Sequence, residues 1–146
     1  MNTDKHVCQI FIKSSTTAVW KALTQGEFTQ RYFHQTRIES SWRAGATVTY
    51  FNTDGSTAVA GEILESAPPN KLSFTWHVHY DETAKKEQPS RVTFLLESIE
   101  DATKLTVIHD NFPDNSVVYP RISEGWIAIL SNLKTMLETD TVMSVS

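Results

Sequence analysis

The first part of the chain alternates apolar and polar residues and then changes to a helical spacing. Val7–Lys13 alternates between the two kinds of side chain, which predicts a strand. The hydroxyl residues at 14–17 are candidate N-caps for a short helix over Ala18–Thr24. Gly26 separates that helix from a second one over Glu27–Phe33. We therefore expect one strand followed by two short helices.

Between residues 36 and 112 the apolar period is two, as in strands with one buried face. Segments rich in Val, Ile, Thr and aromatic residues are separated by turn-forming residues: Thr47–Phe51, Thr57–Glu65, Leu72–Tyr80, Arg91–Glu97 and Lys104–His109. The connections are too short for crossover helices, so these strands should pair antiparallel in chain order.

The last element is the clearest helix of the chain. Apolar residues recur there at helical spacing over about four turns, at Ile122, Trp126, Ile129, Leu130, Leu133 and Leu137. We expect a helix over Ser116–Thr139 and a frayed tail over 139–146. A long amphipathic helix on a curved antiparallel sheet of about six to seven strands is an α+β architecture. We expect residues 1–146 to form a single domain, with its core at about 7–138.

Charge and motif content narrow the function classes. The 146 residues carry 13 basic and 17 acidic side chains, a net charge of −4, and the basic ones are scattered, which argues against a nucleic-acid partner. Cys8 is the single cysteine, no apolar run is long enough to span a membrane, and the first residues lack a signal peptide, so we expect a cytoplasmic protein. No phosphate-binding, dinucleotide, zinc-protease or serine-hydrolase motif occurs, and we expect no cofactor and no metal.

Several short motifs follow one another in a specific order and spacing. They are Val19–Thr24, Gly61–Glu65 leading into Pro68-Pro69, Lys71–Trp76, Arg91–Phe94, Thr103–Thr106 followed by His109, and Gly125-Trp126 with Leu130 and Leu133. Together they resemble the START-like (SRPBCC) superfamily. Within it, the chain is most similar to the branch of the C-terminal domain of the activator of the heat-shock-protein-90 ATPase, from about residue 7 to 138.

The resemblance implies a helix-grip fold, in which the last helix closes one side of the sheet over an apolar cavity or tunnel. Superfamily members carry lipids, hormones or polyketides, some are cyclases, and the eukaryotic activator domain binds a chaperone. Relatives often have Trp before Phe at the end of the second helix, where this chain has Tyr32-Phe33. That difference implies a changed cavity shape or polarity.

Strand alternation and helix spacing predict one large, aromatic-rich concave surface. In Leu72–Tyr80, for example, every second residue from Leu72 onward is apolar and points to one face. His77 and His79 then point to the other face. The candidate ligand-binding residues on this surface are Tyr32, Phe33, Tyr50, Phe74, Trp76, Phe94, His109, Trp126, Ile129, Leu130 and Leu133. The surface is either a solid core or the wall of a ligand cavity, and the resemblance favours the cavity.

Individual polar residues on this surface have a structural and a functional interpretation. His109 is either a buried, neutral, hydrogen-bonded histidine or the group that orients a ligand, with Tyr50, Tyr32 or Glu124 as its partner. His77 and His79 have a chelating spacing but no evident third ligand. Gly125 within the last helix suggests a close approach of a strand or a ligand.

Three functions remain open at this point. The first is binding of a hydrophobic or aromatic molecule (lipid-, polyphenol- or polyketide-like) between sheet and helix, linked to a stress response. The second is a chaperone-interacting module, which would need an exposed apolar or charged docking patch. The third is a cyclase- or hydrolase-type enzyme that uses His109 and a carboxylate.

Overall fold

Antiparallel strands form one sheet along nearly the whole chain. The computed structural model describes residues 2–144, and its strands are β1 (His6–Ile12), β2 (Arg37–Ser40), β3 (Thr47–Phe51), β4 (Thr57–Ala67), β5 (Lys71–Val78), β6 (Ser90–Ile99) and β7 (Ala102–Asp110). The helices are α1 (Thr16–Thr24), α2 (Gly26–Tyr32), α3 (Glu82–Lys85) and α4 (Tyr119–Thr139). The sheet order is β1-β7-β6-β5-β4-β3-β2, with all neighbours antiparallel. The predicted α+β architecture is confirmed.

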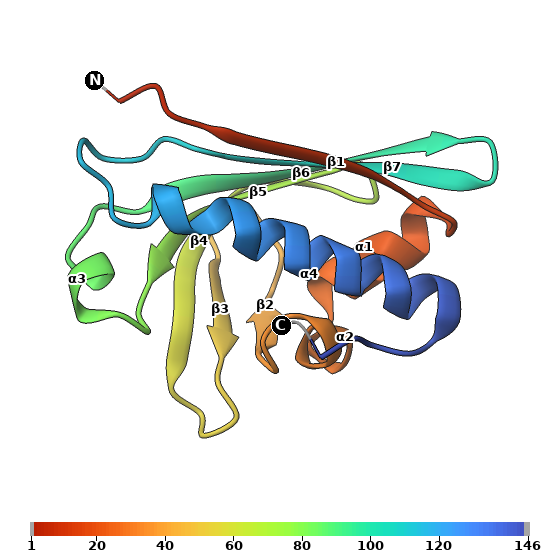
Figure 1. The fold of residues 1–146 in the computed structure, drawn as a ribbon, viewed down its shortest axis with the longest axis horizontal. Helices are drawn as coiled ribbons and strands as arrows, with labels where there is room; N and C mark the ends of the chain where they lie inside the picture. The colour runs from red at the N-terminus through yellow and green to blue at the C-terminus, as the bar shows by residue number, and fades with distance from the viewer. Residues whose placement is uncertain (1, 145–146) are drawn as a thin grey trace.

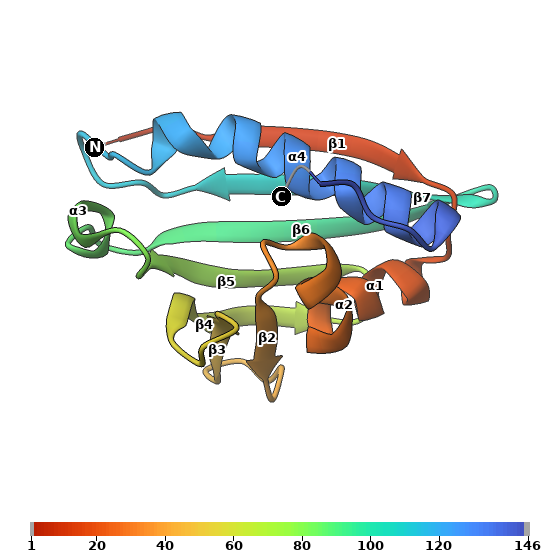
Figure 2. The same cartoon turned by 60° about the horizontal axis from the view of Figure 1, so that its bottom comes forward.

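The sheet curves around the long last helix. Figure 1 shows β1, β6 and β7 running along one side of α4, while β2, β3 and β4 stand at a steep angle on its other side. Figure 2 shows α1 and α2 together near one end of α4 and the short α3 near the other. Within residues 2–144, no helix has the length and apolar run needed to cross a bilayer.

Two short elements differ from the sequence prediction. The strand β2 was not predicted, because only Ile38 among its four residues is a buried apolar side chain. The polar stretch after β5 contains α3, whose N-cap Asp81 accepts a hydrogen bond from the Thr83 backbone N–H at 3.1 Å. Tyr80 was expected on the inner face of this strand, but β5 ends at Val78 and Tyr80 is 67% exposed, so that it reaches this face only at the edge of the pocket described below.

The long helix begins three residues later than its expected start. The hydroxyl of Ser116 accepts from the N–H groups of Val118 and Tyr119 at 3.1 and 3.2 Å, so the capping side chain lies outside the helix that begins at Tyr119. Pro120 fits the first turn because its missing N–H would have no helical partner there. The C-terminal end at Thr139 agrees with the prediction.

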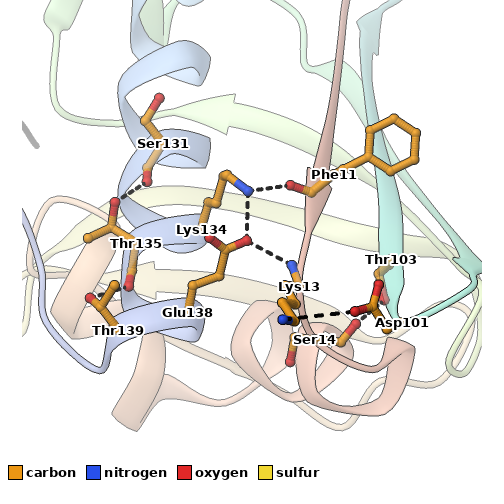
Figure 3. A network of polar contacts seen from close by, with 10 residues as sticks. All are labelled: Phe11, Lys13, Ser14, Asp101, Thr103, Ser131, Lys134, Thr135, Glu138 and Thr139. Atoms are coloured by element: carbon orange, nitrogen blue, oxygen red, sulfur yellow. Dashed lines mark hydrogen bonds and ion pairs between the residues drawn. The ribbon is translucent and has the colours of Figure 1, made fainter.

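Polar contacts attach the C-terminal half of α4 to the end of β1 (Figure 3). The Lys134 ammonium donates to the Phe11 carbonyl at 2.7 Å and to Glu138 Oε2 at 2.6 Å. The same oxygen of Glu138 accepts from the Lys13 backbone N–H at 2.7 Å, and this lowers the pKa of the Glu138 carboxyl. Exposed ion pairs add little stability by themselves. These bonds instead fix the position of the helix over the sheet.

The tail after α4 contacts the helix through Met143, and residues 145–146 of the tail that we predict to fray lie outside the described part. Asn132 is fully buried, and its side chain pairs with the Met143 backbone, accepting from its N–H at 2.7 Å and donating to its carbonyl at 3.3 Å. Arg31 on α2 contacts both the carboxylate and the carbonyl of Asp140. A buried amide on an otherwise apolar helix face therefore holds the tail.

Candidate functional site

A pocket of about 350 Å³ lies between the N-terminal half of α4 and strands β3 to β5. Its walls come from the segment after α2, the β3–β4 hairpin, the end of β5 and one face of α4. The lining residues are Phe33, His34, Thr36, Tyr50, Asn52, Ala58, Val59, Trp76, Tyr80, Ile122, Gly125, Trp126 and Ile129. The volume is at the lower end of the range of about 300–1,000 Å³ for small-molecule sites.

Aromatic rings form the inner wall of this pocket. Phe33 stacks on Tyr50 with centroids 4.6 Å apart and an interplanar angle of 25°. Trp76 and Trp126 meet at 5.5 Å, and the edge of Phe33 faces Trp126 at 5.9 Å. Each ring is held by the others from a different element, so the apolar wall is formed before any ligand enters.

His109 lies behind this wall and not in the pocket. Its ring is fully buried, and Nδ1 accepts from the indole N–H of Trp126 at 3.1 Å. The proton is therefore assigned to Nε2, which donates to the Ser90 hydroxyl at 2.7 Å. That hydroxyl donates onward to the Trp76 carbonyl at 3.4 Å. Burial lowers the pKa of His109 to about 3, with Asp110 opposing the shift, so the ring is neutral.

The polar lining residues are mostly occupied by local bonds. The Thr36 hydroxyl donates to the Phe33 carbonyl at 2.6 Å, and the Asn52 amide donates to the Ser56 hydroxyl at 3.0 Å. His34 lies at the rim, where partial burial lowers its pKa. None of the pocket's lining residues, all within the described range 2–144, is Asp, Glu, Lys or Arg.

The predicted ligand-binding residues separate into two layers. Phe33, Tyr50, Trp76, Trp126 and Ile129 line the pocket. Behind them lie Tyr32, Phe74, Phe94, His109, Leu130 and Leu133, all at most 2% exposed. These second-layer residues pack against one another and against the lining, so the concave surface is a solid core over most of its area and a pocket at its β3–β5 end.

The sequence analysis missed lining residues that come mainly from connections and strand ends. They are His34, Thr36, Asn52, Ala58, Val59, Tyr80 and Ile122. Among these residues, Ala58 is the one that the sequence could have identified. It is a small residue on the inner face of a strand, and such a residue leaves space beside larger neighbours. The rest depend on how the connections fold over the sheet.

The Tyr32-Phe33 pair places only its second ring in the pocket. The Tyr32 hydroxyl donates to the Ala22 carbonyl at 2.7 Å and thereby ties α2 to α1. Phe33, at the C-cap of α2, turns toward Tyr50. The hydroxyl that distinguishes Tyr32 from the tryptophan of relatives is therefore bonded within the core and does not change the polarity of the pocket.

Gly125 lines the pocket and does not mark a close backbone contact. Apart from its chain neighbours and the backbone of its own helix, no heavy atom of residues 2–144 lies within 4 Å of a Cβ atom built at this position. The expected close approach of a strand is therefore wrong. The glycine leaves part of the pocket open at the α4 wall.

The α3 connection is fixed to the start of α4 beside the pocket mouth. Asp81 forms an ion pair with Arg121, which lowers the pKa of the Asp81 carboxyl. The Glu87 carboxylate accepts from the Ser116 hydroxyl at 2.7 Å and from the Val117 N–H at 2.5 Å. Tyr80 and Ile122, which line the mouth, lie next in sequence to Asp81 and Arg121.

His77 near the end of β5 and His79 just after it bond to each other and to α3. His77 Nε2 lies 2.7 Å from the Lys85 carbonyl, and His79 Nε2 lies 3.2 Å from His77 Nδ1. Among residues 2–144 no third His, Cys, Asp or Glu completes a metal-binding group with them. The pair therefore fastens the strand end to α3.

Both the sequence and the fold are similar to those of known proteins. Residues 13–138 match the family described as "Activator of Hsp90 ATPase homolog 1-like protein". A search of curated proteins finds no match. Among solved structures, a protein from Mesorhizobium loti is 23% identical with a TM-score of 0.78, over 92% of this chain and 97% of the other.

Two further solved structures of the same fold have descriptive names. The Aha1 dimer from Colwellia psychrerythraea is 20% identical with a TM-score of 0.74, over 93% of this chain and 97% of that one. An HSP90 activator from Plasmodium falciparum is 22% identical with a TM-score of 0.73, over 92% and 96%. At these identities the structures establish a shared fold.

Proposed function

Since this chain belongs to the family of Activator of Hsp90 ATPase homolog 1-like proteins, we propose that it binds a small hydrophobic or aromatic molecule in the pocket between α4 and β3–β5. The observation that carries the proposal is the preformed, uncharged, ring-lined pocket of about 350 Å³. We also propose that this binding serves a stress response, in keeping with the heat-shock ATPase in the family's description.

Burial of the ligand's apolar surface supplies the affinity in this proposal. Removing apolar surface from water contributes about 25 cal/mol per Å² before the costs of association. Phe33, Tyr50, Trp76, Trp126 and Ile129 make the direct contacts. The residues behind them hold these contacts in place, and His109 does so by accepting the Trp126 indole hydrogen bond.

The test uses N-phenyl-1-naphthylamine, an uncharged probe whose fluorescence rises in apolar surroundings, with two substitutions at Gly125. We expect Gly125→Leu to weaken binding of the probe at least tenfold, because the new side chain extends from a position that faces open pocket space. Gly125→Ala is the matched control and should bind with little change. Both variants should be more stable than the wild type by about 1 kcal/mol, because each removes a helical glycine.

The two variants separate pocket filling from helix stabilisation. Unchanged probe binding in Gly125→Leu, with the helix stabilised, would place the binding elsewhere and reject this pocket. A fall in stability of Gly125→Ala would show that the position is more crowded than its surroundings indicate.

A chaperone-type partner is the second candidate, and the outer face of β1 favours it. Val7 and Phe11 point away from α4 on this edge strand and are 47% and 54% exposed. We expect a Phe11→Ser variant to lose any stimulation of ATP hydrolysis by a purified Hsp90-type chaperone, while it still binds the probe. Equal stimulation by both proteins would exclude this face, and no stimulation by the wild type would reject the candidate.

An enzyme that uses His109 has the least support. The ring is fully buried, both of its nitrogens are hydrogen-bonded, and it is not among the residues that line the pocket. A general base has to reach the proton that it removes.

A further inference from the structure

Two buried tyrosines differ in one respect that bears on the ligand. The Tyr32 hydroxyl donates to the Ala22 carbonyl at 2.7 Å. The Tyr50 hydroxyl has no hydrogen-bond partner among residues 2–144, although the side chain is only 2% exposed. Buried tyrosine hydroxyls usually have a partner, because removing a hydroxyl from water without one is costly.

The free hydroxyl faces the pocket. Among the described residues, the only fully buried side-chain nitrogen or oxygen without a partner is Nε2 of His6. The Tyr50 oxygen, which also lacks a partner, therefore retains contact with open space. Because Tyr50 lines the pocket and is otherwise enclosed by Phe33, Phe74 and Trp76, that space is the pocket itself.

The hydroxyl remains protonated in this position. Burial raises the pKa of Tyr50, so the group offers an O–H donor and no negative charge. The lining contains no Lys or Arg that would balance an anionic ligand and no Asp or Glu that would balance a cationic one. An unpaired charge in such a pocket loses its hydration without compensation.

We infer that the pocket selects an uncharged aromatic carbonyl compound, whose oxygen accepts a hydrogen bond from Tyr50 while its ring packs on Phe33, Trp76 and Trp126. The inference rests on the proposed function of this pocket and specifies its ligand class. A carbonyl oxygen is a suitable partner because a phenol is a better hydrogen-bond donor than acceptor. The ring stack of Phe33 and Tyr50 presents flat surfaces that match a planar ligand.

The test compares two ligands of nearly the same shape, 2-acetylnaphthalene and 2-ethylnaphthalene, as competitors of bound N-phenyl-1-naphthylamine. For each protein the ratio of the two dissociation constants is measured. We expect Tyr50→Phe to shift this ratio toward the hydrocarbon by about threefold to tenfold, the range expected for one hydrogen bond. The affinity for 2-ethylnaphthalene itself should stay the same or rise, because this ligand leaves the Tyr50 hydroxyl of the wild type without a partner, and Tyr32→Phe should leave the ratio unchanged.

Thermal unfolding without ligand gives a second readout. Tyr32→Phe removes a hydrogen bond and should lower the midpoint, whereas Tyr50→Phe removes an unpaired hydroxyl and should leave it equal or higher. A clear fall in Tyr50→Phe, or failure of that variant to fold, would show that the hydroxyl has a structural partner and would overturn the inference.

The outcomes distinguish this inference from the proposal on which it rests. An unchanged ratio in Tyr50→Phe, with both naphthalenes still bound, overturns the carbonyl selectivity and leaves ligand binding in place. Binding of 2-naphthoate as tight as that of 2-acetylnaphthalene overturns the selection of uncharged ligands. Absence of binding of all these compounds and of the probe overturns the proposed function and the inference together.

Discussion

Replacing Gly61 by alanine is expected to lower the free energy of unfolding by about 3 kcal/mol, at the upper end of the usual cost of overpacking. A Cβ atom at this position would lie 1.8 Å from the Thr75 carbonyl oxygen and 2.7 Å from the carbonyl carbon. Both are backbone atoms of β5, so no side chain can rotate away. Thermal unfolding should show a midpoint lower by roughly 10 °C.

The local strand pairing explains why β5 comes so close at Gly61. Ala60 pairs with His77 and Ile63 with Phe74, but between these pairs the Glu62 N–H donates to the Thr75 hydroxyl at 2.8 Å. The side chain of Thr75 thus takes the place of a backbone acceptor, and β4 must lie against it without a side chain at Gly61.

Gly55→Ala serves as the control for this prediction. Gly55 has open space around its Cβ position but a φ of 87°, so alanine should cost only about 1 kcal/mol there, from backbone conformation alone. An equal loss in the two variants would contradict the steric explanation for Gly61.

Most of the fold follows from short-range patterns in the sequence. Alternation over Leu72–Tyr80 and Arg91–Glu97 predicts strands because one face of each is buried against α4, and the six apolar residues of the last helix predict its buried side. β2 gives no such signal, since Ile38 stands alone between Arg37 and Glu39. The contact between Asn132 and Met143 could not be predicted from the sequence either. An asparagine in an amphipathic helix is normally assigned to the exposed face, and only the folded tail provides its partner.

The candidate site follows from the sequence only in part, for a physical reason. Periodicity identifies which side chains point inward, and it predicted Phe33, Tyr50, Trp76, Trp126 and Ile129 correctly as inward-facing. Whether inward-facing rings fill the space or leave a pocket depends on their rotamers and on the strand curvature. At the Phe94 end the rings close on one another, whereas at the β3–β5 end Ala58 leaves room.

Acidification is expected to destabilise the protein through His109, by about 1.4 kcal/mol per pH unit below pH 6.5. Burial lowers the pKa of the folded-state ring to about 3, against 6.5 for the ordinary value. Between these two values the unfolded chain binds a proton that the folded ring does not. The stabilising contribution is therefore fully present above pH 6.5 and is lost progressively down to pH 3.

The geometry accounts for the unfavourable protonation of this ring. Nδ1 already accepts from the Trp126 N–H, so an added proton there would face a donor. The ring is also stacked on Phe112 at 4.7 Å, and of the nearby titratable groups Asp110 favours the charged form while His6 opposes it. A charged His109 would thus push Trp126 away from its place in the pocket wall.

Urea unfolding of the wild type and of His109→Gln, at several pH values from 7.5 to 4.5, tests this expectation. Glutamine keeps a neutral acceptor for Trp126 and a donor for Ser90 but does not titrate. The wild type should lose about 2 to 3 kcal/mol more than the variant between pH 6.5 and 4.5. His34 and His79, whose pKa values are also lowered, remain in both proteins and cancel in the difference. Parallel curves for the two proteins would show that His109 titrates normally, and that the pocket wall does not depend on its neutral form.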